Sequence, residues 1–152
     1  MSQTSQLPRM AAALLALLGL LDATYLSLER LTGGVLACPV GGGCEVVQAS
    51  AYSVLLGIPV AYIGMAGYAA LLVVALRSLH DDYLLNIPVI PLLVGLSTIG
   101  VLFSAYLVYL QFFVIYAICF WCMVSATFQL CIWLIALYEW RQERLEAQAA
   151  AH

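Results

Sequence analysis

Four long apolar runs constrain the fold of this chain more than any other feature of its sequence. The runs cover about residues 10–29, 58–77, 87–113 and 117–139. Each is close to or longer than the roughly 20 residues that an α-helix needs to cross a bilayer. Of the 152 residues, 65% are hydrophobic and 9% are charged, and a soluble domain of this length has too little interior for so much apolar surface. The sequence therefore predicts an all-α fold: a single domain over residues 1–152, built as an integral membrane four-helix bundle.

The few charged residues predict how the helices cross the membrane. An even number of crossings places both termini on the same side, and basic residues favour the cytoplasmic side. With the termini in the cytoplasm, Arg9, Arg77, Arg141 and Arg144 lie inside and only Arg30 lies outside. We thus expect a multi-pass protein of the inner or plasma membrane, in contact with membrane lipid. Because the net charge is −3 and only five residues are basic, nucleic acid is not an expected partner.

Four cysteines form two pairs that are predicted to face the same side of the membrane. Cys38 and Cys44 lie in a loop between the first and second apolar runs, and three consecutive glycines between them give the loop mobility. Cys119 and Cys122 form a C-x-x-C sequence at the start of the fourth run. Two membrane crossings separate the loop from the C-x-x-C, so both pairs are expected on the extracytoplasmic side. Disulfide bonds form and persist on that side.

Three interpretations of the four cysteines are open at this point. A disulfide relay needs a mobile, accessible pair and a second pair beside an electron acceptor, and inside a lipid phase the acceptor that fits is a quinone. The N-terminus of a helix favours a thiolate in the C-x-x-C. The second interpretation is a zinc site with four cysteine ligands, for which the loop pair is widely spaced. The third is a non-catalytic membrane protein with structural disulfides, although a C-x-x-C closes almost no loop and so gains little entropy.

Two further features lie between the loop cysteines and the second apolar run. Ser50 lies six residues after Cys44, and the stretch Ala51–Pro59 leads into the second run. A loop cysteine pair after the first span, a Ser at this spacing and a C-x-x-C that opens the fourth span occur in one order along the chain. This order resembles the vitamin K epoxide reductase family in its bacterial form. The resemblance covers about residues 10–140.

The resemblance implies an enzyme, a quinone-dependent thiol–disulfide oxidoreductase whose four-helix bundle surrounds the quinone. Its loop pair would oxidise a thioredoxin-like partner, with Cys38 as the point of contact. Cys44 would pass the electrons to Cys119, and Cys122 would reduce ubiquinone or menaquinone. Ser50 would lie near the quinone and the active cysteines. The protein would thereby support disulfide formation outside the cytoplasm.

The chain also departs from parts of the family. Ala126 stands where vertebrate members have a Tyr four residues after the C-x-x-C, and the second apolar run contains no Asn. These departures argue against vitamin K epoxide as the substrate. Some bacterial members carry a fused thioredoxin domain, whereas this chain ends at His152. The expected partner is therefore a separate extracytoplasmic thioredoxin-fold protein of the Dsb type.

Four other residues are candidates for the quinone site or for proton transfer. Gln111 and Tyr116 either polarise a quinone carbonyl or anchor the third helix at the membrane interface. Trp121 either flanks the quinone or anchors the fourth helix. Asp22 is a carboxylate within the first apolar run, with Tyr25 on the same helical face, and intramembrane carboxylates are costly and often functional. We expect Asp22 to be either a proton relay or a group that organises the bundle through a hydrogen bond.

Overall fold

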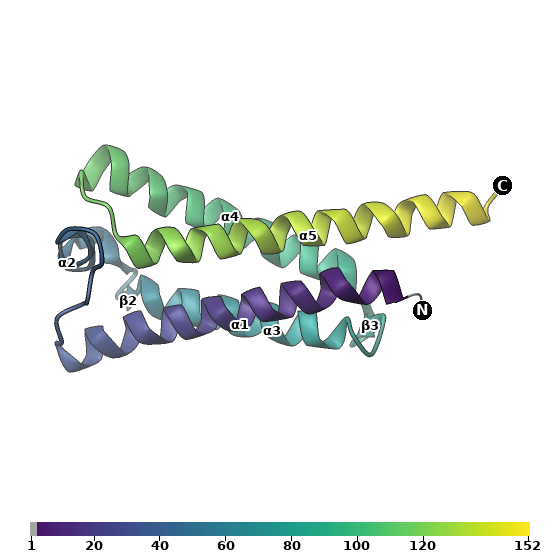
Figure 1. Cartoon of the computed structure of the whole chain (residues 1–152), viewed down its shortest axis with the longest axis horizontal. Coiled ribbons are helices and arrows are strands. Elements are labelled where there is room, and N and C mark those ends of the chain that lie inside the picture. Colours follow the sequence, from purple (N-terminus) through teal and green to yellow (C-terminus); the bar gives the residue numbers. More distant parts are fainter. Residues whose placement is uncertain (1–2) are drawn as a thin grey trace.

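The computed structural model describes residues 3–152, with side chains from residue 6 onward; Met1 and Ser2, at the start of the predicted domain, lie outside the described residues. Within this range the chain forms four long helices, α1 (Gln3–Thr32), α3 (Val60–Arg77), α4 (Val89–Leu110) and α5 (Phe120–Ala150). Helix α1 packs against α3 and α5, and α4 packs against α5 and α3 (Figure 1). Each of the four is long and apolar enough to cross a membrane. The predicted all-α membrane bundle, with a cysteine-bearing loop between its first two spans, is confirmed.

Short elements connect the spans. Helix α2 (Gly43–Ala49) and the 3₁₀ turn η1 (Ala51–Ser53) follow α1. A hairpin of β1 (Val54–Leu55) and β2 (Ile58–Pro59) leads into α3, and a hairpin of β3 (Tyr83–Leu84) and β4 (Ile87–Pro88) leads into α4. A π-helix, η2 (Gln111–Ile115), continues α4 to its end.

One sequence pattern builds both hairpins. Leu-Leu-x-Ile-Pro-Val occurs at residues 55–60 and again at residues 84–89. The two tip residues have positive φ in each case: 53° and 83° at Leu56-Gly57, and 51° and 66° at Leu85-Asn86. Tight turns of this kind match the twist of two paired strands. The proline that follows lacks a backbone N–H and favours a helix start, so each hairpin turns the chain directly into the next span.

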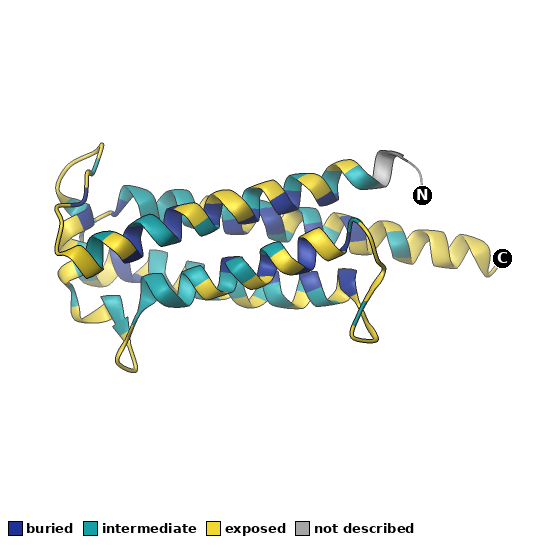
Figure 2. Cartoon of the chain, turned by 90° about the horizontal axis from the view of Figure 1, so that it is seen from below, coloured by how far each residue is buried: buried dark blue, intermediate teal, exposed yellow. Residues whose placement is uncertain are grey.

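Small residues hold the helices together, and large apolar residues face outward. Ala12 and Ala16 of α1 are fully buried in the core of the bundle, where small side chains permit close approach of two helices. Leu14, Ile99 and Leu134 are more than half exposed, and Figure 2 shows such exposed residues along the outer faces of the helices. Apolar side chains on the outside of a membrane bundle are solvated by lipid.

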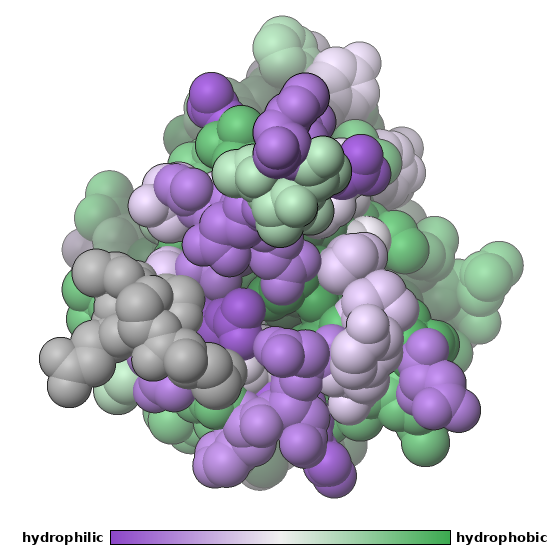
Figure 3. All heavy atoms as spheres, turned by 90° about the vertical axis from the view of Figure 1, so that its right-hand side faces the viewer, coloured by the Kyte–Doolittle hydropathy of each residue, from purple (hydrophilic) through white to green (hydrophobic). Residues whose placement is uncertain are grey.

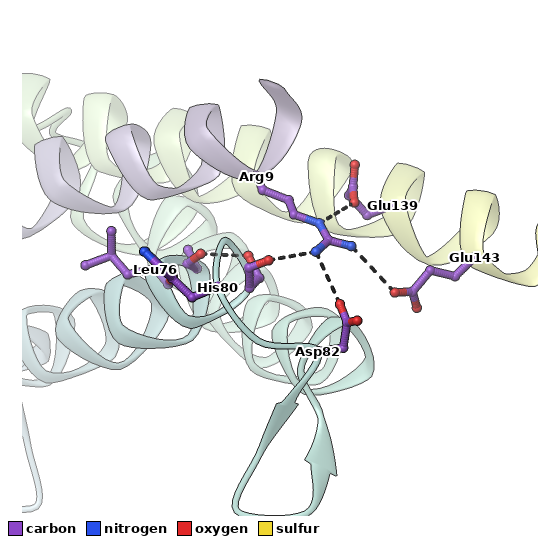
Figure 4. Close-up of polar contacts among 8 residues, drawn as sticks. Arg9, Leu76, His80, Asp82, Glu139 and Glu143 are labelled. Carbon is purple, nitrogen blue, oxygen red and sulfur yellow. Dashed lines mark hydrogen bonds and ion pairs between the residues drawn. The ribbon is translucent and has the colours of Figure 1, made fainter. Parts of the chain in front are cut away.

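Arg9 is buried at the end of the bundle that holds the start of α1. Its Nε atom donates to Glu139 Oε2 at 3.0 Å, and its Nη1 atom donates to the Ser78 carbonyl at 2.7 Å. Asp82 and Glu143 lie 3.6 and 3.8 Å from the same guanidinium group. Figure 4 shows how Arg9 joins α1 to α5 and to the segment between α3 and β3. Figure 3 views this end, where hydrophilic side chains gather, as expected where a bundle leaves the membrane.

Replacing Arg9 with Gln is expected to lower the free energy of unfolding by about 2 kcal/mol, because it leaves the buried Glu139 carboxylate without its charged partner. Arg77→Gln is the matched control. Arg77 lies 3.9 Å from Asp81, and both of these side chains are more than half exposed, so its loss should cost below about 1 kcal/mol. Denaturant unfolding in one detergent measures both variants. Equal losses would show that the Arg9 ion pairs do not hold this end of the bundle together.

Candidate functional site

The two cysteine pairs meet at the opposite end of the bundle, where α2 lies beside the start of α5 (Figure 1). Cys44, on α2, forms a disulfide with Cys38, and Cys119 immediately precedes α5. Cys44 and Cys119 are fully buried and belong to one apolar cluster with Leu26 of α1. Cys38 is half-buried in the loop. The structure therefore brings the loop pair and the C-x-x-C together.

A close backbone contact holds α2 against the C-x-x-C segment. Gly43 begins α2 and packs against Ile118, so that a Cβ atom at position 43 would overlap the Ile118 carbonyl group. Gly43 immediately precedes Cys44, and Ile118 immediately precedes Cys119. Glycine at position 43 thus permits the spacing at which the two cysteines lie in one cluster.

The C-x-x-C is in its dithiol form. Cys119 is the N-cap of α5, and its Sγ atom accepts a hydrogen bond from the backbone N–H of Cys122 at 3.3 Å. The thiol of Cys122 donates to the same sulfur at 2.6 Å. The hydrogen bond from Cys122 lowers the pKa of the Cys119 thiol, against the opposing effects of burial and of the charge on Asp22. These contacts favour a thiolate on Cys119 over one on Cys122.

Gln111 positions Cys119 from the end of α4. It is buried, and its Oε1 atom accepts a hydrogen bond from the backbone N–H of Cys119 at 2.8 Å. The π-helix η2 begins at Gln111, and Tyr116 ends it in the left-handed region at φ 55°. π-Helical turns are rare and often occur at functional sites. Here the turn carries the chain from the third span into the C-x-x-C and directs the Gln111 amide toward it.

A cavity of about 230 Å³ lies beside the C-x-x-C, between α1, α3, α4 and α5. Most of its wall is apolar, and its polar lining includes Ser50, Tyr68, Gln111, Cys122, Ser125 and Gln129. Of the four sequence-predicted quinone residues, Ser50 and Gln111 line this cavity. An apolar cavity with a few converging polar groups is the usual form of a small-molecule site.

Arg30 hydrogen-bonds to the segment of residues 48–53, which lines one side of this cavity. From the last turn of α1, its Nη1 atom donates to the Gln48 carbonyl at 2.9 Å and to Ser53 Oγ at 3.0 Å. Gln48, Ser50 and Ser53 all line the cavity. The Ser50 hydroxyl donates to the Val47 carbonyl at 2.7 Å, which closes the end of α2. The loop that carries the disulfide is thus tied to the first span as well as to the C-x-x-C.

Trp121 and Tyr116, the other two sequence-predicted quinone residues, lie outside the cavity. The Trp121 Nε1 atom donates to the Ala37 carbonyl at 2.9 Å, immediately before Cys38 in the loop. Its ring packs edge-on against Tyr25, with 5.4 Å between ring centroids. Tyr116 is 82% exposed. Trp121 therefore holds the loop through this hydrogen bond. Tyr116 is the left-handed residue at which the chain turns from η2 toward the C-x-x-C.

Several polar residues of the cavity wall were not among the candidates from the sequence, and Tyr68 and Ser125 are two of them. The Tyr68 hydroxyl donates to the Ser125 carbonyl at 2.6 Å, and the Ser125 hydroxyl donates to the Tyr68 oxygen at 3.1 Å. Ser125 lies three residues after Cys122, a spacing that places both on one helical face, and this spacing was an available signal. Tyr68 stands within an apolar run that offers no such signal.

Comparison with known protein families shows a match over most of the chain. The model of the vitamin K epoxide reductase family matches residues 10–137. The matched range includes both cysteine pairs and every residue of the cavity wall.

Proposed function

We propose that this chain, which belongs to the vitamin K epoxide reductase family, oxidises a separate thioredoxin-fold protein and passes the electrons to a quinone. Family membership makes it a membrane thiol–disulfide oxidoreductase in the general sense, and its four apolar helices make it a multi-pass protein. The proposal of electron transfer to a quinone rests on the position of the two cysteine pairs relative to each other and to the cavity. Cys44 and Cys119 share one buried cluster, and Cys122 lines the cavity.

The electrons enter at the loop. A thiolate of the partner attacks Cys38, the more exposed sulfur of the Cys38–Cys44 disulfide, and Cys44 leaves as a thiolate. A second thiolate of the partner then attacks its own mixed disulfide with Cys38, so the partner gains a disulfide and the loop gains two thiols.

The electrons then cross to the C-x-x-C. Cys44 attacks Cys119 of an oxidised Cys119–Cys122 pair, which releases Cys122. Cys38 next attacks Cys44, which restores the loop disulfide and leaves Cys119 and Cys122 reduced. The arrangement in the structure, with the loop pair oxidised and the C-x-x-C reduced, corresponds to the product of this step.

The cavity residues fit the head group of a quinone. A quinone bound there supplies a two-electron acceptor beside Cys122. The Oε1 atom of Gln111 is engaged by Cys119, so its amide NH₂ group is left to donate to a carbonyl oxygen in the cavity. Tyr68 adds a polar group from α3; its hydroxyl donates to the Ser125 carbonyl and reaches a quinone oxygen only by rotating away from that carbonyl. The apolar remainder of the wall excludes water and suits a planar ring and the start of an isoprenoid chain.

Orientation in the membrane completes the proposal. Helix α2 and the start of α5, which carry the two pairs, lie at the end of the bundle opposite to the start of α1 (Figure 1). Arg9 lies near the start of α1 (Figure 4), and the distribution of arginines favours the cytoplasm for that end. The active cysteines then face the extracytoplasmic side, where substrate proteins acquire disulfides.

Quinol formation by the purified protein tests this function. We expect it with a reduced thioredoxin-fold donor and either ubiquinone or menaquinone, followed by the quinone absorbance. Cys38→Ser should abolish the donor-dependent rate. Cys131→Ser is the matched control, because this free cysteine lies further along α5 and has no part in the proposed relay, and it should retain the full rate. No quinol with either quinone, in protein that retains its fold, would overturn the proposal.

A further inference from the structure

Asp22 is a buried carboxylate that the proposed electron path does not use. It lies on α1 within the membrane span and is 8% exposed. Neither of its carboxylate oxygens has a hydrogen-bond partner among the described residues. An ionised carboxylate in such a place, without a partner, is strongly disfavoured. We therefore expect Asp22 to hold a proton in at least one state of the catalytic cycle.

Asp22 lies between a groove on the outside of the bundle and the wall of the cavity. Together with Tyr25 and Trp121 it lines the groove, which runs between α1 and α5. Ser125, a residue of the cavity wall, lies near the Asp22 carboxyl group. The Ser125 hydroxyl donates to Tyr68 rather than to Asp22. The Ser125 oxygen is thus left to accept a hydrogen bond from Asp22 when Asp22 is protonated.

Tyr68 continues this row of polar groups into the cavity. Its ring packs against Gly19 of α1, where a Cβ atom would overlap it. Gly19 lies three residues before Asp22, so the Tyr68 ring passes α1 on the turn next to the carboxylate. Tyr68 lines the cavity, and its hydroxyl accepts from the Ser125 hydroxyl and donates to the Ser125 carbonyl. Asp22, Ser125 and Tyr68 therefore form a row of donors and acceptors that ends at the proposed quinone site.

We propose that Asp22 supplies one of the two protons that quinone reduction consumes, through the hydroxyl groups of Ser125 and Tyr68. This inference rests on the proposed function and adds a residue to it. Proton transfer along the row shifts each hydroxyl proton by one position: Asp22 donates to Ser125, Ser125 to Tyr68, and Tyr68 to the oxygen of the acceptor. For the last transfer the Tyr68 O–H rotates from the Ser125 carbonyl to the acceptor.

The redox state of the C-x-x-C controls the proton on Asp22. Reduction of the pair by the loop leaves a thiolate on Cys119 and a thiol on Cys122. The charge on Asp22 acts on Cys119, and two negative charges in an apolar setting repel strongly. Asp22 therefore takes a proton from water when Cys119 becomes a thiolate. It releases that proton when oxidation of the pair removes the thiolate charge.

Atoms and charges balance in this step. The reactants are the Cys119 thiolate, the Cys122 thiol, protonated Asp22 and the quinone. The products are the Cys119–Cys122 disulfide, ionised Asp22 and the quinol. The S–H bond of Cys122 supplies one proton, Asp22 supplies the other, and both electrons come from the two sulfur atoms. One negative charge is present before and after the step, and it moves from Cys119 to Asp22.

Asp22→Asn tests the inference, because it keeps the size of the side chain and removes the proton. We expect quinol formation by this variant to slow by about 10²-fold, while transfer of electrons from the loop to the C-x-x-C keeps its native rate. The remaining rate should fall as the pH rises, since the second proton must then come from water. The native rate should vary less with pH. The other titratable groups that face Asp22 are Cys119, Cys122, Tyr68 and Tyr25, and the variant leaves all of them in place.

Two further measurements separate proton supply from a structural role. Tyr68→Phe should slow quinol formation as Asp22→Asn does, whereas Tyr25→Phe, which removes a hydroxyl from the groove side of α1, should not. Infrared difference spectra recorded on reduction of the C-x-x-C, without quinone, should show a protonated carboxyl band that Asp22→Asn lacks. If native protein forms quinol but Asp22→Asn matches it at every pH, or the band persists in the variant, this inference is wrong and the proposed function stands. If native protein forms no quinol, the proposed function itself fails.

Discussion

A disulfide between Cys44 and Cys119 is expected to accumulate in protein that carries Cys122→Ser, with a loss of quinone reduction of at least about 10³-fold. In the native relay, Cys44 attacks Cys119 and Cys122 leaves. With serine at position 122 the C-x-x-C cannot form its own disulfide. The Cys119 thiolate then attacks Cys44 of the loop disulfide, with which it shares a buried cluster, and Cys38 is released. No thiol remains at position 122 to resolve the bond.

Peptide mapping of non-reduced Cys122→Ser protein measures this disulfide directly, and alkylation before digestion should label Cys38 as a free thiol. Cys131→Ser is the control, and it should show the native Cys38–Cys44 disulfide. A Cys38–Cys44 bond retained in Cys122→Ser protein, after incubation with a reduced donor, would contradict direct exchange between the two pairs. It would favour separate structural roles for the cysteines.

The apolar runs predicted the spans because bilayer thickness leaves few other structures for such segments. The same reasoning placed both cysteine pairs at one end, since two crossings lie between them. The hairpins before α3 and α4 did not emerge from the sequence analysis. Each of their strands has only two residues. The sequence signal for them is the repeat of Leu-Leu-x-Ile-Pro-Val, which can be recognised only when its two copies are compared.

Side-chain partners at the site were harder to predict than helices. From the sequence, Gln111 and Trp121 were candidates either for contact with the quinone or for anchoring a helix at the membrane interface. In the structure their hydrogen bonds go to the backbone, that of Gln111 to Cys119 and that of Trp121 to Ala37. Which backbone group a side chain meets depends on the π-helical turn and on the path of the loop, and neither is encoded in residue type alone.

For Asp22, in contrast to Gln111 and Trp121, the position in the sequence was informative. Its sequence position alone made it a candidate, because a carboxylate within an apolar span is costly. The sequence left open whether a hydrogen bond within the bundle satisfies it. In the structure both carboxylate oxygens lack a partner among the described residues, so no hydrogen bond from these residues stabilises the ionised form of Asp22. The alternative, a proton relay, is the one that the neighbouring hydroxyl groups of Ser125 and Tyr68 favour.

Gly43→Ala is expected to slow donor-dependent quinone reduction by about 10²-fold, because displacement of a reacting group by about 1 Å has an effect of this size. The added methyl group would overlap the Ile118 carbonyl, and a backbone group cannot rotate away as a flexible side chain does. The start of α2 must then move from the C-x-x-C segment, and Cys44 moves with it. Cys119 and Cys122 keep their own hydrogen bonds and their place beside the cavity.

Gly42→Ala is the matched control for this substitution. It adds the same methyl group one residue earlier, at a φ of −81° that any residue adopts, and a Cβ there meets nothing within 4 Å. Both variants replace one of the three glycines of the loop, so they restrict the unfolded chain to the same extent. A difference between them therefore reports the contact with Ile118 and not loop stiffness.

The assay can also locate the defect within the relay. A small dithiol that reduces the Cys119–Cys122 disulfide directly should restore quinol formation by Gly43→Ala to the native rate, because the quinone step does not use α2. Cys122→Ser should gain nothing from the same dithiol. Equal donor-dependent rates for Gly43→Ala and Gly42→Ala would mean that exchange between the pairs does not depend on the close approach of α2. In that case the loop must move away from its position in the structure before Cys44 reaches Cys119, and its mobility would limit the rate.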